Sequence, residues 1–261
     1  MRNVRAFLWG ALIGVLGGLI GLGGAEFRLP VLVGVYKFRT LQAIVINLIV
    51  SLVTVIFSFI FRVRLVNPDS ITSHAPVVLD ILAGSLLGSY LGVRFTTRIN
   101  ERTLTKIVTV FLVILSTVLI GHDFIFQARS FAFPFLLKFI LGALAGVLIG
   151  VFSSMLGVAG GELIIPTIII LFAVDIKLAG SLSLAVSIPT IIMGLAKYAR
   201  QKQLSGIRQH AGFILWMSAG SIPGALSGSY LLGYVRVSFL QLLLGLILLI
   251  SAIKLWREHP R

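Results

Sequence analysis

The chain has 261 residues, of which 58% are hydrophobic and 11% charged, with a formal net charge of +14 and no cysteine. Globular domains carry about 25% charged residues, so this composition excludes a soluble fold. The continuous apolar runs exclude a transmembrane β-barrel, whose strands alternate, and the missing cysteine excludes disulfides and thiolate metal sites. Basic residues cluster at the ends of apolar runs, which indicates a membrane surface and not nucleic acid as the partner.

We therefore expect an all-α polytopic membrane protein. An apolar N-terminal run resembles a signal peptide, but its similarity to an internal segment predicts that it belongs to the mature protein. It ends in a glycine-rich motif. Further segments near the roughly 20 residues of a spanning helix lie at Leu41–Phe61, Ala75–Gly92, Leu104–Gly121, Leu137–Leu156, Ala179–Ala196, Phe213–Val235 and Phe239–Leu255.

The glycine-rich motif occurs twice, which predicts two homologous repeats. GLGGAEFRLP at Gly21–Pro30 recurs as GVAGGELIIP at Gly157–Pro166, an offset of 157 − 21 = 136 residues. The same offset joins identical residues elsewhere, among them Ser51 and Ser187, Thr54 and Thr190, His74 and His210, Gly84 and Gly220, and Gly88 and Gly224. We expect repeat 1 at 1–121, a linker rich in phenylalanine at 122–136, and repeat 2 at 137–261.

Two topologies fit this repeat. If the first segment of each unit spans the bilayer, each unit crosses four times and the repeats run parallel. If that segment and the short apolar piece after the motif form a re-entrant hairpin, three crossings remain and the repeats are inverted, as in many secondary transporters. The positive-inside rule favours the inverted arrangement, which places more basic residues on the cytoplasmic side and Arg62 outside.

The motif is expected to break an apolar helix, because its glycines permit φ > 0 and its proline lacks an N–H. Broken backbone at membrane depth is tolerated beside protein or a water-filled cavity, and its N–H groups suit a small anion. The alternative is close helix packing, which we favour for Gly10, Gly14, Gly84 and Gly88. The site positions are Gly21, Gly23, Gly24 and Pro30, with Gly157, Gly160, Gly161 and Pro166.

Charged residues lie inside both copies of the motif. Glu26 and Glu162 occupy equivalent places, and a charged side chain at the bilayer centre costs about 2.5–3.5 kcal/mol on insertion scales. Three roles are open for them: proton carrier, cation ligand, or counter-ion to Arg28. Arg28 has no basic counterpart, because Ile164 stands at its equivalent. It either forms a salt bridge with a glutamate or binds an oxyanion with parallel hydrogen bonds.

Small polar residues follow each motif on one face of the next helix. Asn47, Ser51 and Thr54 stand at i, i+4 and i+7. Their counterparts are Ser183, Ser187 and Thr190. Such residues line a cavity or hydrogen-bond to neighbouring helices. We include Asn47, Ser51, Ser183 and Ser187 in the expected substrate site.

The doubled pattern G-x-G-G-x-x-x-x-x-P resembles the signature of the TauE/SafE family of sulfite exporter-like permeases. The stretch Ala179–Leu204, with hydroxyl residues early and Lys197, Tyr198 and Arg200 late, is similar to the second half of that family. The resemblance covers the whole chain and implies transport of a sulfur oxyanion or organosulfonate across the cytoplasmic membrane. The chain departs from the family pattern at Glu26, Arg28 and Glu162, which leaves a proton-coupled variant open.

These observations predict a multi-pass protein of the cytoplasmic (inner) membrane. It would be a secondary transporter of a small anion by alternating access, with proton coupling through Glu26 or Glu162 as an option. Its expected partners are membrane lipid, the anion and protons. No P-loop, metal-ligand spacing or nucleophile–base pair occurs, so we predict no cofactor, no metal and no enzyme. An ion channel and a membrane-assembly factor without transport activity are the alternatives.

Overall fold

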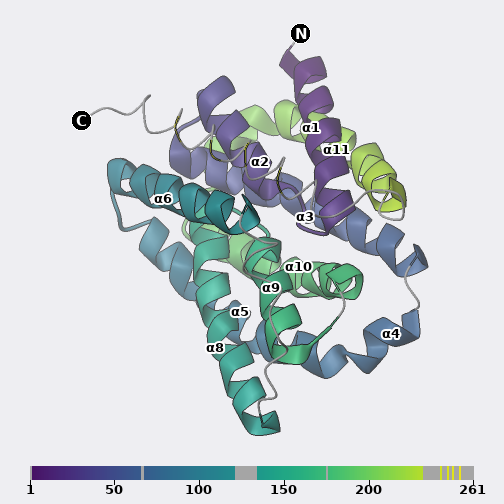
Figure 1. The fold of residues 1–261 in the computed structure, drawn as a ribbon. Helices are drawn as coiled ribbons and strands as arrows, with labels where there is room; N and C mark the ends of the chain where they lie inside the picture. Colours follow the sequence, from purple (N-terminus) through teal and green to yellow (C-terminus); the bar gives the residue numbers. More distant parts are fainter. Residues whose placement is uncertain are drawn as a thin grey trace.

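In a computed structural model, the described residues are 2–65, 68–120, 134–174 and 176–231, with single positions at 242, 246, 249 and 253. Their regular structure is helical, as the composition predicts (Figure 1). The elements are α1 (Arg2–Ile20), α2 (Ala25–Pro30), the π-helical turn η1 (Val31–Val35), α3 (Thr40–Leu65), α4 (Pro68–Ser73), α5 (Ala75–Thr96), α6 (Glu101–Ile120), α8 (Phe135–Leu156), α9 (Gly161–Phe172), α10 (Ile176–Arg200), the 3₁₀ turn η2 (Ser205–His210) and α11 (Ala211–Leu231).

Five of these helices are long and apolar enough to cross a membrane, namely α1, α3, α5, α8 and α10. Large apolar side chains cover their outer faces, and Leu8, Leu79 and Leu148 are each at least 60% exposed. An apolar exterior of this kind faces lipid. The chain is therefore an integral, multi-pass membrane protein. The expected span at Phe239–Leu255 and most of the linker at 122–136 lie outside the described residues.

Two closely packed helix pairs frame the molecule, α1 with α11 and α5 with α8 (Figure 1). Both pairs meet through glycines spaced four residues apart. A Cβ at Gly10 would overlap the carbonyl of Met217, and one at Gly88 the carbonyl of Val147. Absent side chains let the backbones approach closely, as small-xxx-small contacts do in membranes. The packing role predicted for Gly10, Gly14, Gly84 and Gly88 is thus confirmed.

Helix starts recur at the spacing of the motif. α2 and α9 begin at Ala25 and Gly161, and α3 and α10 at Thr40 and Ile176; both differ by 136 residues (161 − 25 and 176 − 40). The contacts recur as well, because the first helix of each predicted unit packs on the corresponding helix, α5 or α11, of the other unit.

The helix breaks lie at the glycines and not at the prolines. Gly21, Gly23 and Gly24 adopt φ values of +88°, +83° and +71°, a region that other residues rarely occupy. Pro30 ends α2 but the chain continues directly into η1, and Pro166 lies inside α9. The expectation that the prolines interrupt the helices is therefore wrong. Each proline instead removes the N–H that would bond to the carbonyl four residues earlier, which belongs to Glu26 or Glu162.

Candidate functional site

The two glycine breaks contact each other in the interior. A Cβ on Gly23 would lie 3.2 Å from the Cβ of Ala159, and one on Gly161 would lie 3.0 Å from the Cα of Leu22. Each break also packs on the long helix of the other half, the first break on α10 and the second on α3. The position of a Cβ at Gly21 is 2.7 Å from the Gly180 carbonyl oxygen, and that at Gly157 is 2.6 Å from the oxygen of Ile44.

Two side chains at equivalent positions bind the breaks across this contact. The Asn47 amide donates to the Gly157 carbonyl and to the Ala25 carbonyl, each at 2.8 Å. The Ser183 hydroxyl donates to the Gly21 carbonyl at 2.9 Å. Asn47 and Ser183 thereby satisfy the backbone oxygens of Gly157 and Gly21, which lie in the breaks and outside the helices. Both side chains hold the two breaks together.

Arg28, on α2, is fully buried against the polar face of α3. Its Nη1 donates to Asn47 Oδ1 at 3.2 Å and to Ser51 Oγ at 2.8 Å, and its Nη2 donates to Thr54 Oγ1 at 3.1 Å. The predicted stripe therefore faces this guanidinium. Ile164 stands at the equivalent place in the second half, and there Ser187 donates to the Ala159 carbonyl at 2.7 Å instead. The structure does not contain the alternative salt bridge, because Arg28 bonds to no glutamate and its Nε alone lacks a partner.

Both motif glutamates are buried without a partner among the described residues. Glu26 is 1% exposed and Glu162 is 5% exposed, and none of their four carboxylate oxygens accepts a hydrogen bond. Asp80 on α5 is a third such carboxylate, 1% exposed. An ionised carboxylate out of water is unfavourable unless a donor, a cation or a proton satisfies it. Glu26 and Glu162 therefore mark positions where an incoming proton or ligand would be stabilised.

Arg62 is a buried charge beside the breaks that the sequence analysis missed. It was expected in an external loop, but it is 1% exposed near the end of α3. Its Nη2 donates to the Leu19 carbonyl at 3.3 Å, in the last turn of α1, where the helix dipole favours a cation. Gly21 and Gly180 both contact its Nη1 and make room for it. Its Nε and Nη1 have no hydrogen-bond partner in the part of the chain that the structure describes.

The repeat offset gives this arginine a structural counterpart, although the sequence alone did not indicate that either side chain is buried. Position 62 corresponds to 198 (62 + 136), and Tyr198 is likewise fully buried, with its hydroxyl donating to the Ser154 carbonyl at 2.9 Å. Both polar side chains thus reach back from a long helix to the end of the first helix of the same half. One of them carries a charge and the other does not.

The equivalent histidines lie at the ends of helices, away from this centre. His74 precedes α5, and His210 packs its ring against Phe38 at a centroid distance of 4.9 Å. Burial, and to a lesser extent the positive charge of Arg2, lowers the pKa of His210. Within the described residues, no three acidic or histidine side chains gather in a group that could hold a metal ion.

The helices and their buried polar centre define an integral multi-pass membrane protein in which broken helices hold charged side chains out of water. The family model for the sulfite exporter TauE/SafE matches residues 1–119 and 141–261. The chain therefore belongs to the TauE/SafE family of membrane transporters, and the resemblance drawn from the doubled motif is confirmed. No curated protein and no solved structure matches the chain significantly.

Proposed function

We propose that this protein is a secondary permease that moves a small sulfur oxyanion or organosulfonate across the cytoplasmic membrane by alternating access. The observation that carries the proposal is the buried centre. Two broken helices contact each other there, and Glu26, Glu162 and Arg62 present polar atoms that have no partner among the described residues. Unpaired buried groups cost about 1–3 kcal/mol each, or more when charged, and a transported ligand would satisfy them.

Arg62 and Arg28 have different roles in this proposal. Three side chains already occupy the terminal nitrogens of Arg28, so it fixes the polar face of α3 beside the first break. Arg62 retains two donors, Nε and Nη1, next to the break glycine Gly21. Nε and Nη1 lie on different edges of the guanidinium, so each can donate a separate charge-assisted hydrogen bond to an oxygen of sulfite or a sulfonate. Arg62 is thus the anion-binding side chain, and the motif glycines with Asn47, Ser51, Ser183 and Ser187 shape its surroundings.

The two glutamates couple the anion to protons. An ionised carboxylate near the breaks would repel the anion, so the anion and a proton on Glu26 or Glu162 favour each other's binding. Favourable coupling of this kind is reciprocal and links the two fluxes. The carboxylates therefore act as proton carriers, in preference to cation ligands.

Inverted repeats, with repeat 1 at 1–121 and repeat 2 at 137–261, supply the two gates. The contact between α5 and α10 supports this arrangement. Ser85 Oγ lies 2.7 Å from Thr190 Oγ1, and further along both helices Lys197 Nζ lies 3.7 Å from the centre of the Tyr90 ring. The two helices therefore run in the same direction. Three crossings per unit make them parallel, whereas four crossings would make them antiparallel.

Flux into liposomes tests the transport proposal. Purified protein should carry sulfite or a simple sulfonate down its gradient, and an inward proton gradient should accelerate uptake. Arg62→Gln should weaken anion binding tenfold or more, because it removes a charged double donor. Tyr198→Phe is the matched control, since it loses a hydroxyl at the equivalent position and should leave binding unchanged. Absence of flux for both anions, with and without the pH gradient, would refute the proposal.

A further inference from the structure

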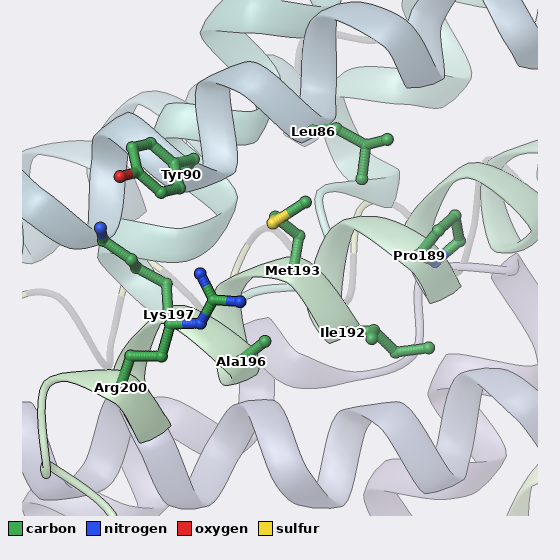
Figure 2. A pocket seen from close by; sticks show the side chains of 8 residues that line it. All are labelled: Leu86, Tyr90, Pro189, Ile192, Met193, Ala196, Lys197 and Arg200. Carbon is green, nitrogen blue, oxygen red and sulfur yellow. The ribbon is translucent and has the colours of Figure 1, made fainter.

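A groove of about 510 Å³ opens between α5 and α10, away from the breaks. Leu86 and Tyr90 line it from α5, and α10 contributes the remaining residues from Pro189 to Arg200 (Figure 2). Its floor is apolar, formed largely by Leu86, Met193 and Ile192. The basic side chains Lys197 and Arg200 lie together at one end, beside the Tyr90 ring (Figure 2).

We infer that this groove binds one anionic phospholipid, with an acyl chain along Leu86, Met193 and Ile192 and the phosphate at Lys197 and Arg200. The charge pattern carries the assignment. Among the described residues that line the groove, none is acidic, and the two cations Lys197 and Arg200 lie at the C-terminal end of α10. Arg94, one helical turn beyond Tyr90 on the same face of α5, adds a third basic residue at that end. Basic pockets between transmembrane helices bind anionic lipid headgroups.

The length of the groove agrees with this occupant. From Pro189 to Arg200 the helix rises by 11 residues, or roughly 16 Å at 1.5 Å per residue. Half of a bilayer's hydrocarbon core is about 15 Å. The groove therefore runs from the headgroup level to about the middle of one leaflet, which an acyl chain would span. Ile192 is 49% exposed, so the groove is open to the bilayer along this length.

The groove could instead be a path for the transported anion, but its lining residues argue against that role. Five of the eight lining residues are aliphatic or methionine, namely Leu86, Pro189, Ile192, Met193 and Ala196. A small oxyanion would gain nothing from that floor, whereas an acyl chain gains about 0.8 kcal/mol for each buried methylene. The lysine is also fixed against the Tyr90 ring by a cation–π contact, which holds a cation at the groove mouth.

Binding of defined lipids to the full-length protein in detergent tests the inference by native mass spectrometry. Phosphatidylglycerol should bind much more tightly than phosphatidylcholine. The double variant Lys197→Gln/Arg200→Gln should lose roughly thirtyfold in phosphatidylglycerol affinity and approach the phosphatidylcholine value. The matched control is Arg102→Gln/Lys106→Gln, which removes two exposed cations from α6 and should keep the preference.

A second variant separates the acyl groove from the charges. Ile192→Trp should fill the groove and weaken both lipids, while the thermal stability without lipid stays unchanged because the position is half exposed. Equal binding of the two lipids by the unmodified protein would overturn the inference. So would an equal loss in the α6 control, or displacement of the lipid by glycerol 3-phosphate alone at matching concentration.

Discussion

Two buried arginines, Arg28 on α2 and Arg62 on α3, differ in how many of their guanidinium nitrogens have a hydrogen-bond partner. The terminal nitrogens of Arg28 donate to three side chains of α3. Arg62 instead donates to a single carbonyl oxygen, and its other two nitrogens have no partner among the described residues. A guanidinium whose two terminal nitrogens are both bonded to the protein stabilises the structure and has little left for a ligand. An under-satisfied one is unfavourable in isolation and becomes favourable when an anion arrives. At the scale of single residues, we therefore propose that Arg28 is a structural cation and Arg62 a functional one.

Removing Arg28 should lower stability more than binding. Arg28→Ala deletes three hydrogen bonds from a charged donor, so we expect a loss of about 3 kcal/mol and a fall in Tm of about 6–12 °C. Thr54→Val removes one acceptor and should cost about 1 kcal/mol. Thermal unfolding in detergent measures both, and anion titration of the folded variants should show little change. Normal stability together with weakened anion binding would instead place Arg28 at the ligand.

The pH dependence of transport should depend on the motif glutamates. Glu26→Gln and Glu162→Gln keep the shape of the side chain but cannot release a proton, so we expect a flatter pH profile of sulfite uptake. Asp80→Asn is the control, because Asp80 is equally buried and unpartnered but lies on α5 beside Gly142, outside both breaks. Its profile should match that of the unmodified protein. Unchanged profiles in both glutamate variants would exclude them as proton carriers.

At the scale of elements, the breaks and the glycine-packed pairs were the parts that local sequence could predict. The glycines within Gly21–Gly24 indicate where the backbone adopts positive φ. The glycines spaced four residues apart indicate which faces of α1, α11, α5 and α8 pack closely. The prediction that the prolines interrupt the helices was wrong, because a proline can remove one backbone hydrogen bond while the helix continues, as at Pro166 in α9. The burial of Arg62 could not be read locally, since its acceptor Leu19 lies 43 residues away.

The glycine contact between α1 and α11 should fail when a methyl group is added. A Cβ at Gly224 would overlap the Ala11 carbonyl, whereas Gly212, in the first turn of the same helix, has nothing within 4 Å. Gly224→Ala should therefore destabilise by about 1–3 kcal/mol through overpacking. Gly212→Ala should be neutral or stabilise by about 0.5–1 kcal/mol. Equal thermal shifts for the two variants would mean that α1 and α11 do not approach so closely.

At the scale of the whole molecule, the composition predicted a helical membrane protein and the doubled motif its family, but both left the path of the chain through the bilayer open. Charge counting favoured inverted repeats only narrowly, and it counted Arg62 in an external loop although that residue is buried. The long-range contacts between α5 and α10 add independent support to the proposed inverted arrangement. Ser85 beside Thr190 and Tyr90 beside Lys197 join helices from different halves, and no local pattern specifies such pairs.

The parallel course of α5 and α10 makes the two topologies separable by labelling. The chain has no cysteine, so single cysteines can be introduced without background. Arg98→Cys follows α5, Arg208→Cys follows α10, and Thr72→Cys precedes α5. Because parallel helices that cross the bilayer end on the same side, Arg98→Cys and Arg208→Cys should react with an impermeant maleimide from one side and Thr72→Cys from the other. In the four-crossing arrangement, Arg208→Cys and Thr72→Cys would share a side instead, and the inverted repeat would be refuted together with its two-gate mechanism.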